Sequence, residues 1–367
     1  MMNTVAICNL CMKEAAPNHF YEKYFLDGEE VLISLLDVEE TDYDLYFDEK
    51  SILIKVNAFS CNFRDRSLIH YFSSQCRRLS GDRKYFYSPI GSEFAGVVVK
   101  RGSHVTAFQI GDRVMGDMTF PFRKNGEIGG VVTNYASQRL LLLKECQLRK
   151  IPDCMSNVVA AAFVLSAQTA YSMVRKAKLS GGENVLLTAA TSNTSLAIIE
   201  RLKSFPVNVY AISSKATSVR KQLLEMGVKD VFTVEDMSAN VGAIQNIKFD
   251  VVFDPFIDLY INRISRFLNW GAKYIFCGFY RQNDLFVSKS IQEDLKTNSI
   301  YSICITLNLS LIGNCLGDMN DLNNAILDYM EGKFSIRVDS VYTGTDIKMF
   351  FDKTFLKERF GKVVYEY

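Results

Sequence analysis

The sequence lacks an excess of charge of either sign. Its 42 lysines and arginines against 41 aspartates and glutamates leave a formal net charge of +1 over 367 residues. Proteins that bind nucleic acid or an anionic membrane surface usually carry a basic surplus, so electrostatics implies neither partner. With 48% hydrophobic and 23% charged residues, the composition is that of an ordinary globular chain, long enough for two domains.

A long apolar run and a signal region are also missing. No stretch approaches the length of a transmembrane helix, and the N-terminus has no basic segment followed by an apolar one. The nine cysteines are odd in number and scattered, which is typical of reduced thiols. We therefore expect a cytoplasmic protein that does not use a membrane.

Metal ligands are scarce. The chain has three histidines, His19, His70 and His104. Cys8 and Cys11 form one Cys-x-x-Cys pair without a second pair, which does not complete a structural zinc site.

Glycine is missing from the turn around which the chain is organised. Residues 184–187 form a short apolar strand, residues 196–205 carry apolar side chains at helical spacing, and residues 207–212 form the next strand. Such a unit presents helix N–H groups at the end of a sheet, which is a ready site for a pyrophosphate. The turn itself holds Thr191, Ser192, Asn193, Thr194 and Ser195. The residues alone leave two interpretations open, phosphate contact through side-chain donors or simple capping of the helix.

The remaining pattern is mostly that of strands. Residues 5–10, 31–36 and 51–59 are predicted strands, and the carboxylate-rich run 37–48 predicts a solvated loop. Later strands are expected at 230–234, 251–254, 274–278 and, as an apolar run, 300–311.

Two segments carry a family resemblance. Residues 58–65 are similar to the segment of polyketide-synthase enoyl reductases that contains Leu-Asn-Phe-Arg-Asp. Residues 90–116 include Gly-Ser-Glu-Phe-Ala-Gly and Gly-Asp-Arg-Val-Met-Gly, and strongly resemble the medium-chain dehydrogenases and reductases. Further similar segments follow in family order at 160–171, 249–254, 271–278 and 361–364.

The resemblance implies an α/β fold, with a Rossmann dinucleotide-binding domain plus a β-rich GroES-like catalytic domain. The catalytic domain would comprise residues 1–155 and 312–367, and the Rossmann domain residues 156–311. In this family the region around 300–311 often pairs with its twin across a dimer, so we expect a homodimer.

The resemblance also implies a nicotinamide cofactor. The family's phosphate-binding glycines fall on Ser192 and Ser195, and Thr169, Cys277 and Gly278 fall at further cofactor-binding positions. The second strand of the unit ends without the carboxylate that NAD sites place on the ribose hydroxyl. It ends instead in hydroxyls and cations, which suit a 2′-phosphate, so NADPH is expected; a solvated basic loop is the alternative. These residues are Ser213, Ser214, Lys215 and Arg220.

Zinc-dependent members of the superfamily bind the catalytic metal through a cysteine, a histidine and a second cysteine or acidic residue. Those positions map to Asn62, Ser92 and Leu165, and Cys61 lies one position away from the first. No cysteine lies between Cys76 and Cys146 to form a structural zinc lobe. We therefore expect no metal.

Reduction of an activated C=C bond fits a site without a Lewis acid, because hydride adds at the β-carbon and a proton at the α-carbon. Asn62 is the candidate amide donor to the developing enolate oxygen. Tyr71 falls near the position of a proton-donating tyrosine in polyketide enoyl reductases; simple aromatic packing, or a role for the adjacent His70, is the alternative. Arg64 and Asp65 fit a structural ion pair equally well.

Two classes of function remain open. The first is an NADPH-dependent reductase whose substrate is a peptide or a small electron-poor alkene. Its narrowest form resembles the lantibiotic enzymes that reduce dehydroalanine in a precursor peptide to D-alanine, and its competitor is a quinone or enone oxidoreductase or a zinc-free alcohol dehydrogenase-like enzyme. The second class is a non-catalytic scaffold that binds a peptide or protein.

Overall fold

The computed structural model describes residues 2–38, 46–78, 86–239, 242–280, 297–356 and 358–367. The chain divides into two compact units, Met1–Leu165 with Val338–Tyr367, and Ser166–Arg337. Both divisions differ from the expected boundaries at 155/156 and 311/312. The first falls inside helix α3 (Asn157–Ala177), and residues 312–337 belong to the second unit because ion pairs hold them to that helix.

The main sheet of the first unit has the strand order β16-β17-β4-β6-β7-β9, with β8 paired to β4. Its pairs are antiparallel except for β16 with β17. The strands are β4 (Ser51–Ser60), β6 (Glu93–Arg101), β7 (Arg113–Gly116), β8 (Leu140–Lys144), β9 (Leu148–Lys150), β16 (Val338–Tyr342) and β17 (Lys362–Glu366), and the helices of the unit are α1 (Leu10–Ala15), α2 (Asp65–Arg78) and α11 (Ile347–Phe351).

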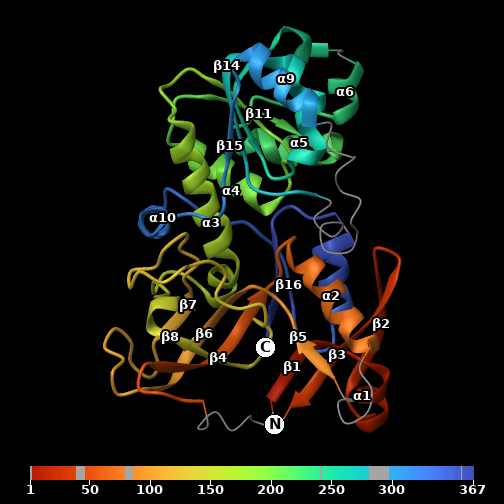
Figure 1. The fold of residues 1–367 in the computed structure, drawn as a ribbon, viewed down its shortest axis with the longest axis vertical. Helices are drawn as coiled ribbons and strands as arrows, with labels where there is room; N and C mark the ends of the chain where they lie inside the picture. Colours follow the sequence, from red (N-terminus) through yellow and green to blue (C-terminus); the bar gives the residue numbers. More distant parts are fainter. Residues whose placement is uncertain (1, 39–45, 79–85, 240–241, 281–296, 357) are drawn as a thin grey trace. The chain divides into compact units, whose positions relative to one another are not determined.

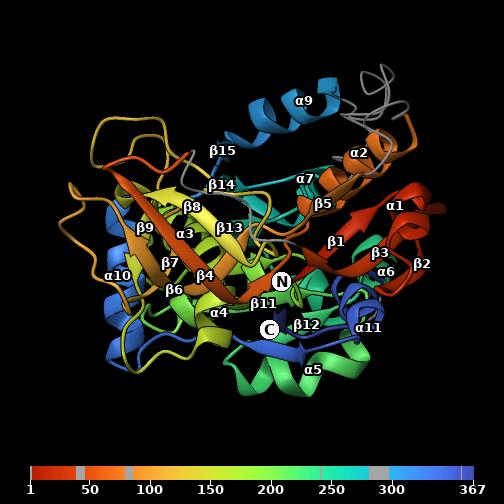
Figure 2. The ribbon, with the colours of Figure 1, turned by 90° about the horizontal axis from the view of Figure 1, so that it is seen from below.

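A second, antiparallel sheet is formed mostly by the N-terminal strands, with the order β2-β3-β1-β5 (Figure 2). It consists of β1 (Met2–Cys8), β2 (Phe20–Leu26), β3 (Glu29–Val38) and β5 (Tyr87–Pro89). The Ser137 hydroxyl donates to the Val5 carbonyl at 2.6 Å, and the Tyr367 hydroxyl accepts from the Val5 N–H at 3.2 Å. The N-terminal sheet is therefore joined to the C-terminal strand and shares its apolar core. The expected strands at 5–10, 31–36 and 51–59 correspond to β1, β3 and β4. Residues 39–45 of the predicted acidic loop lie outside the described residues.

The second unit is a parallel sheet in the order β12-β11-β10-β13-β14-β15 (Figure 1), which is the doubly wound arrangement of dinucleotide-binding folds. The fold class predicted from the sequence is thus confirmed. The strands are β10 (Asn184–Leu187), β11 (Asn208–Ile212), β12 (Asp230–Phe232), β13 (Phe249–Asp254), β14 (Leu268–Phe276) and β15 (Ser310–Gly313), and the helices are α4 (Asn193–Leu202), α5 (Ala216–Glu225), α6 (Val234–Ala239), α7 (Ile257–Ile264), α9 (Thr297–Leu307) and α10 (Met319–Met330).

The predicted strand at 300–311 is wrong over most of its length. Helix α9 ends at Leu307, and only β15 is extended. A continuous apolar run does not distinguish a strand from a buried helix. Here Ile300, Ile303 and Leu307 recur at helical spacing and pack on the core of the second unit, so burial of one face selects the helix.

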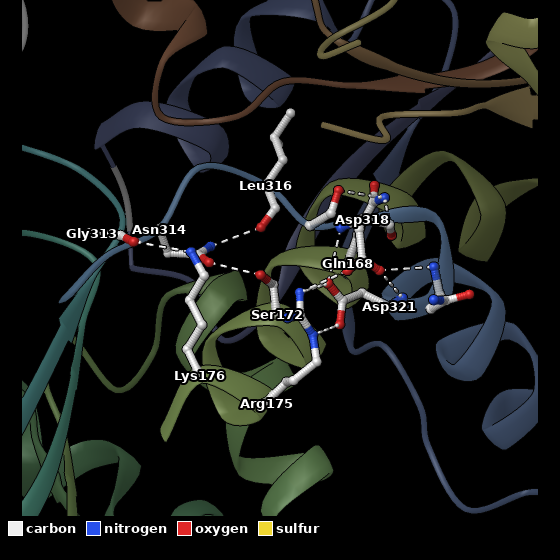
Figure 3. A network of polar contacts seen from close by, with 11 residues as sticks. Gln168, Ser172, Arg175, Lys176, Gly313, Asn314, Leu316, Asp318 and Asp321 are labelled. Carbon is white, nitrogen blue, oxygen red and sulfur yellow. Dashed lines mark hydrogen bonds and ion pairs between the residues drawn. The ribbon is translucent and has the colours of Figure 1, made fainter. Parts of the chain in front are cut away.

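Helix α3 is long and apolar enough to cross a membrane by those two criteria, but 78% of its most apolar window is buried inside the protein, as in a core helix. Its second half carries a polar network that fixes the segment after β15 (Figure 3). Arg175 binds Asp321 through two nitrogens, at 2.8 and 2.7 Å, and the Lys176 ammonium donates to the Gly313 carbonyl at 3.0 Å. The Ser172 hydroxyl donates to the Asn314 side chain at 2.8 Å.

Candidate active site

The turn between β10 and α4 is closed by its own side chains. The Ser192 hydroxyl caps the helix by accepting the Ser195 N–H at 3.1 Å. The buried Ser195 hydroxyl donates to the Thr188 carbonyl at 2.8 Å, so it connects the helix to the end of β10 at a position where the resemblance implies a glycine. The Asn193 amide donates to the Ser166 hydroxyl. Three of the five polar turn residues therefore hold the fold together.

The other two polar residues of the turn do not hold the fold together in this way. Thr191 and Thr194 are half-buried, and within the described parts of the chain their hydroxyls have no hydrogen-bond partner. The first N–H groups of a helix also lack intrahelical acceptors. The bend before them is made by Ala189, whose φ of +45° lies in the left-handed region that normally favours glycine. The N-terminus of α4, with these two hydroxyls beside it, suits a pyrophosphate.

The residues predicted to bind a 2′-phosphate, at and after the end of β11, differ in exposure and in their contacts. Ser213 is buried, and its hydroxyl accepts the Lys215 N–H at 3.1 Å, whereas Ser214 is exposed and Lys215 is half-buried at the start of α5. The Arg220 guanidinium lies on β12, where it pairs with Asp230 at 2.5 Å and donates to the Val231 carbonyl at 2.9 Å. Ser214 is therefore the exposed member of the set beside Lys215, whereas the Arg220 guanidinium is engaged by β12.

A buried carboxylate, which the sequence analysis did not single out, ends strand β13. Asp254 is fully buried and accepts hydrogen bonds from the Thr188 hydroxyl at 2.5 Å, the Phe256 N–H at 2.8 Å and the Tyr274 hydroxyl. Burial raises its pKa to about 6 against these hydrogen bonds, which lower it. The only signal in the sequence is an acidic residue directly after an apolar strand.

The remaining predicted cofactor residues occupy different environments. Thr169 is buried on α3, and burial raises the pKa of the Cys277 thiol to about 12. Gly278 is required sterically, because a Cβ atom there would lie 2.8 Å from the Pro255 carbonyl oxygen.

In the first unit, Asn62 belongs to a buried polar network. Its amide nitrogen donates to the Ser92 hydroxyl at 2.9 Å and to a Glu93 carboxylate oxygen at 3.0 Å, and its amide oxygen accepts from the Lys362 ammonium. Lys362 and Glu93, each 1% exposed, form an ion pair at 2.6 Å. The Ser92 hydroxyl donates in turn to Asp65 at 2.6 Å. Sequence reasoning missed Lys362 because 300 residues separate it from Asn62.

The three positions mapped as metal ligands do lie together. Asn62 contacts Ser92 directly, and the Leu165 N–H donates to Glu93 at 2.8 Å. Their donor set does not fit zinc, which requires thiolate, imidazole or carboxylate ligands. No cluster of three or more histidine, cysteine or acidic side chains occurs among the described residues. Burial raises the pKa of the neighbouring Cys61 thiol well above its usual value, which opposes thiolate formation.

Tyr71, the candidate proton donor, lies at the surface of the first unit. Tyr71 is 54% exposed on α2, and its ring contacts Phe72 at a centroid distance of 5.6 Å. Arg64 pairs with Asp65 at 3.2 Å and donates to the Asn134 side chain at 3.0 Å, which is the structural arrangement considered above. Burial raises the Asp65 pKa, and Arg64 opposes that rise.

His70 connects α2 to the β2–β3 hairpin. Its Nε2 lies 2.7 Å from Asp27 and its Nδ1 3.6 Å from Glu29. Burial lowers the His70 pKa, and Glu29 partly offsets this effect. The side chain is engaged in holding the hairpin, which is a structural role.

Residues 48–144 match the alcohol dehydrogenase GroES-like domain family. A quinone oxidoreductase-like protein 2 homolog from Nematostella vectensis is 33% identical over 135 residues, 36% of this chain and 32% of that protein. The 2-methylene-furan-3-one reductase of Solanum lycopersicum is 27% identical over 212 residues, 56% of this chain and 50% of that protein. The chain spans half or less of the length of the curated relatives it matches, several of which are polyketide synthases.

Solved structures share the whole fold. A cobalt- and zinc-bound thermostable alcohol dehydrogenase from Pyrobaculum aerophilum superposes with a TM-score of 0.70 at 21% identity, covering 99% of this chain and 100% of that one. The GroES-like match, the doubly wound second unit and these similarities together show the fold that the sequence resemblance implied, a GroES-like unit and a dinucleotide-binding type of sheet.

Proposed function

We propose that the protein is an NADPH-dependent reductase of electron-poor C=C bonds. The observation that carries the proposal is a hydrogen-bonded network at Asn62, Ser92 and Leu165, the positions to which the resemblance maps the zinc ligands, in a chain that has a dinucleotide-binding type of sheet. Polarising an isolated carbonyl without a Lewis acid is difficult, whereas a conjugated alkene accepts hydride at carbon.

The second unit offers residues that would hold the cofactor. Thr191, Thr194 and the N-terminus of α4 suit the pyrophosphate, and Ser214 with Lys215 suits a 2′-phosphate. When bound, NADPH supplies the hydride. This chain's own contribution in the first unit is a polar donor at Asn62, which stabilises negative charge developing on the substrate oxygen.

Within this class we propose dehydroalanine in a lantibiotic precursor peptide as the most specific substrate, reduced to D-alanine. Its CH₂=C–C=O unit is a methylene group conjugated with a carbonyl, as is the compound in the name of the tomato relative. The similarity to a quinone oxidoreductase-like protein supports the competing proposal, a quinone or simple enone reductase.

The test offers three substrates to the protein with NADPH: a dehydrated lantibiotic precursor peptide, an α-methylene ketone and a benzoquinone. We expect mass spectrometry to show two hydrogens added per reduced peptide residue, together with loss of NADPH absorbance. Rapid reduction of the quinone or ketone with an untouched peptide would support the competitor. A protein that binds no NADPH and oxidises none would instead be the non-catalytic scaffold.

A further inference from the structure

We infer that Lys362 is a positioning residue that sets the direction and the donor strength of the Asn62 amide, and so supplies the positive charge that a metal ion would supply at this place in the fold. The inference rests on the proposed function for its kinetic consequence, but its structural consequence can be measured without any substrate.

The ion pair determines which way the amide points. An ammonium group can only donate hydrogen bonds, and an ionised carboxylate can only accept them. Lys362 therefore requires the oxygen of Asn62, and Glu93 requires its nitrogen. A flipped amide would place its NH₂ group against the ammonium and its oxygen against the carboxylate, so only one orientation satisfies both charges.

Burial gives this arrangement its strength. Lys362, Glu93, Asp65 and Ser92 are each at most 1% exposed, whereas Asn62 is half-buried. Water therefore screens the ammonium poorly, and its charge acts on the amide that it touches. A charge-assisted bond to the amide oxygen draws electron density from the nitrogen and makes its hydrogens better donors.

One of the two amide N–H groups can exchange its hydrogen-bond acceptor for a substrate oxygen at low cost in free energy. The bond to Glu93 satisfies a buried charge, but the bond to Ser92 goes to a neutral hydroxyl that also donates to Asp65 at 2.6 Å. Losing the Ser92 bond leaves no charge unpaired. The N–H group on the Ser92 side is thus the one that would donate a hydrogen bond to an enolate oxygen.

The experiment compares wild type with Lys362→Met/Glu93→Gln, a pair of changes that removes both charges together, because Lys362→Met alone would leave a buried carboxylate unpaired. Lys353→Met is the matched control, since Lys353 pairs with Asp339 at 3.3 Å elsewhere in the first unit and touches none of the network. Correct folding is checked by circular dichroism and by an unchanged NADPH dissociation constant.

The substrate-free measurement is the ¹⁵N-edited spectrum of the Asn62 side chain, assigned with Asn62→Ala. In wild type we expect its NH₂ signals to be slowly exchanging. In the double variant they should move and exchange at least about tenfold faster, because the bond to Lys362 is gone. Unchanged shifts and exchange in a folded double variant would overturn the inference, whether or not the protein reduces any alkene.

The kinetic measurement uses a series of enones with increasingly electron-withdrawing substituents. The double variant should lose about tenfold or more in kcat with little change in KM, and its kcat should depend more steeply on the substituent. Asn62→Ala should cost less in the double variant than in wild type, because Lys362 acts through Asn62. Additive losses would assign Lys362 a separate role and contradict the inference.

Discussion

Hydrogen bonding and burial have opposite effects on the pKa of Asp254. It accepts three hydrogen bonds, which favour the carboxylate, but complete burial outweighs them and raises its pKa from 3.8 to about 6. Between these two pH values the folded protein binds a proton that the unfolded chain does not. The free energy of unfolding therefore falls as pH rises from about 4 to 6 and stays lower above that range.

Replacing Asp254 by Asn should remove this loss. Asn keeps an acceptor for Thr188 and Phe256 but does not ionise, so we expect the second unit to gain up to about 3 kcal/mol at neutral pH, the equivalent of a two-unit shift. Urea unfolding at several pH values measures the difference. The exposed Glu225→Gln on α5 is the control and should leave the curve unchanged. A variant whose stability falls at neutral pH would show that the ionised carboxylate is stabilising.

We expect Lys215 to favour NADPH over NADH. Its position at the start of α5, beside the exposed Ser214, suits a 2′-phosphate. Lys215→Ala should weaken NADPH binding by about 1–3 kcal/mol and leave NADH binding nearly unchanged, because only NADPH carries that phosphate. Fluorescence titration measures both. Lys221→Ala, an exposed lysine on the same helix, is the control. Equal affinity of the wild type for the two cofactors would falsify the NADPH assignment.

At the scale of elements, we expect some side chains of the turn after β10 to stabilise the fold and others to bind the cofactor. Ser192→Ala removes the helix cap and should cost about 1 kcal/mol of unfolding free energy. Thr191→Ala and Thr194→Ala remove hydroxyls that make no hydrogen bond within the described chain, so they should weaken NADPH binding while thermal unfolding stays at the wild-type temperature. The reverse pattern would mean that the threonines are structural and that the phosphates lie elsewhere.

Elements were predictable from the sequence where a local pattern defined them. The strand, turn and helix at 184–202 follow from a change of hydrophobic period, and the capping role of Ser192 follows from residue type. Helix α9 was not predictable in this way, because an apolar run satisfies either structure until tertiary packing selects one. The candidate site was predictable only in part. Asn62 and Ser92 came from resemblance, but their contacts with Lys362 depend on strands that meet only in the folded chain.

At the scale of the whole molecule, the N-terminal sheet adds to what the family match describes. Strands β1, β2 and β3 lie before residue 48, where the GroES-like match begins. Strand β1 is held by residues distant in the sequence, since Val5 contacts Ser137 and Tyr367. The sequence predicted two of these strands, β1 and β3, but not their pairing into a sheet of their own, because pairing over such distances leaves no local signal.

Measuring the metal content of the purified protein tests the expectation that this chain binds no catalytic zinc. We expect purified protein to carry far less than about one zinc per chain, and its activity to survive chelation, because Asn62, Ser92 and Leu165 supply no ligand that zinc prefers. Elemental analysis and an assay in chelator measure this directly. About one zinc per chain, lost together with activity, would contradict the expectation and make Cys61 the first ligand to test.

A second experiment tests whether Lys362 opposes metal binding at this site. Asn62→Cys with Ser92→His would place a thiol and an imidazole beside Glu93, which already accepts from Lys362 at 2.6 Å. These two changes alone should bind zinc weakly, because the buried ammonium both repels the ion and occupies the carboxylate. Adding Lys362→Met releases Glu93 and should raise zinc affinity by at least about tenfold. Equal zinc binding with and without Lys362 would show that the ammonium does not compete with a metal for this place.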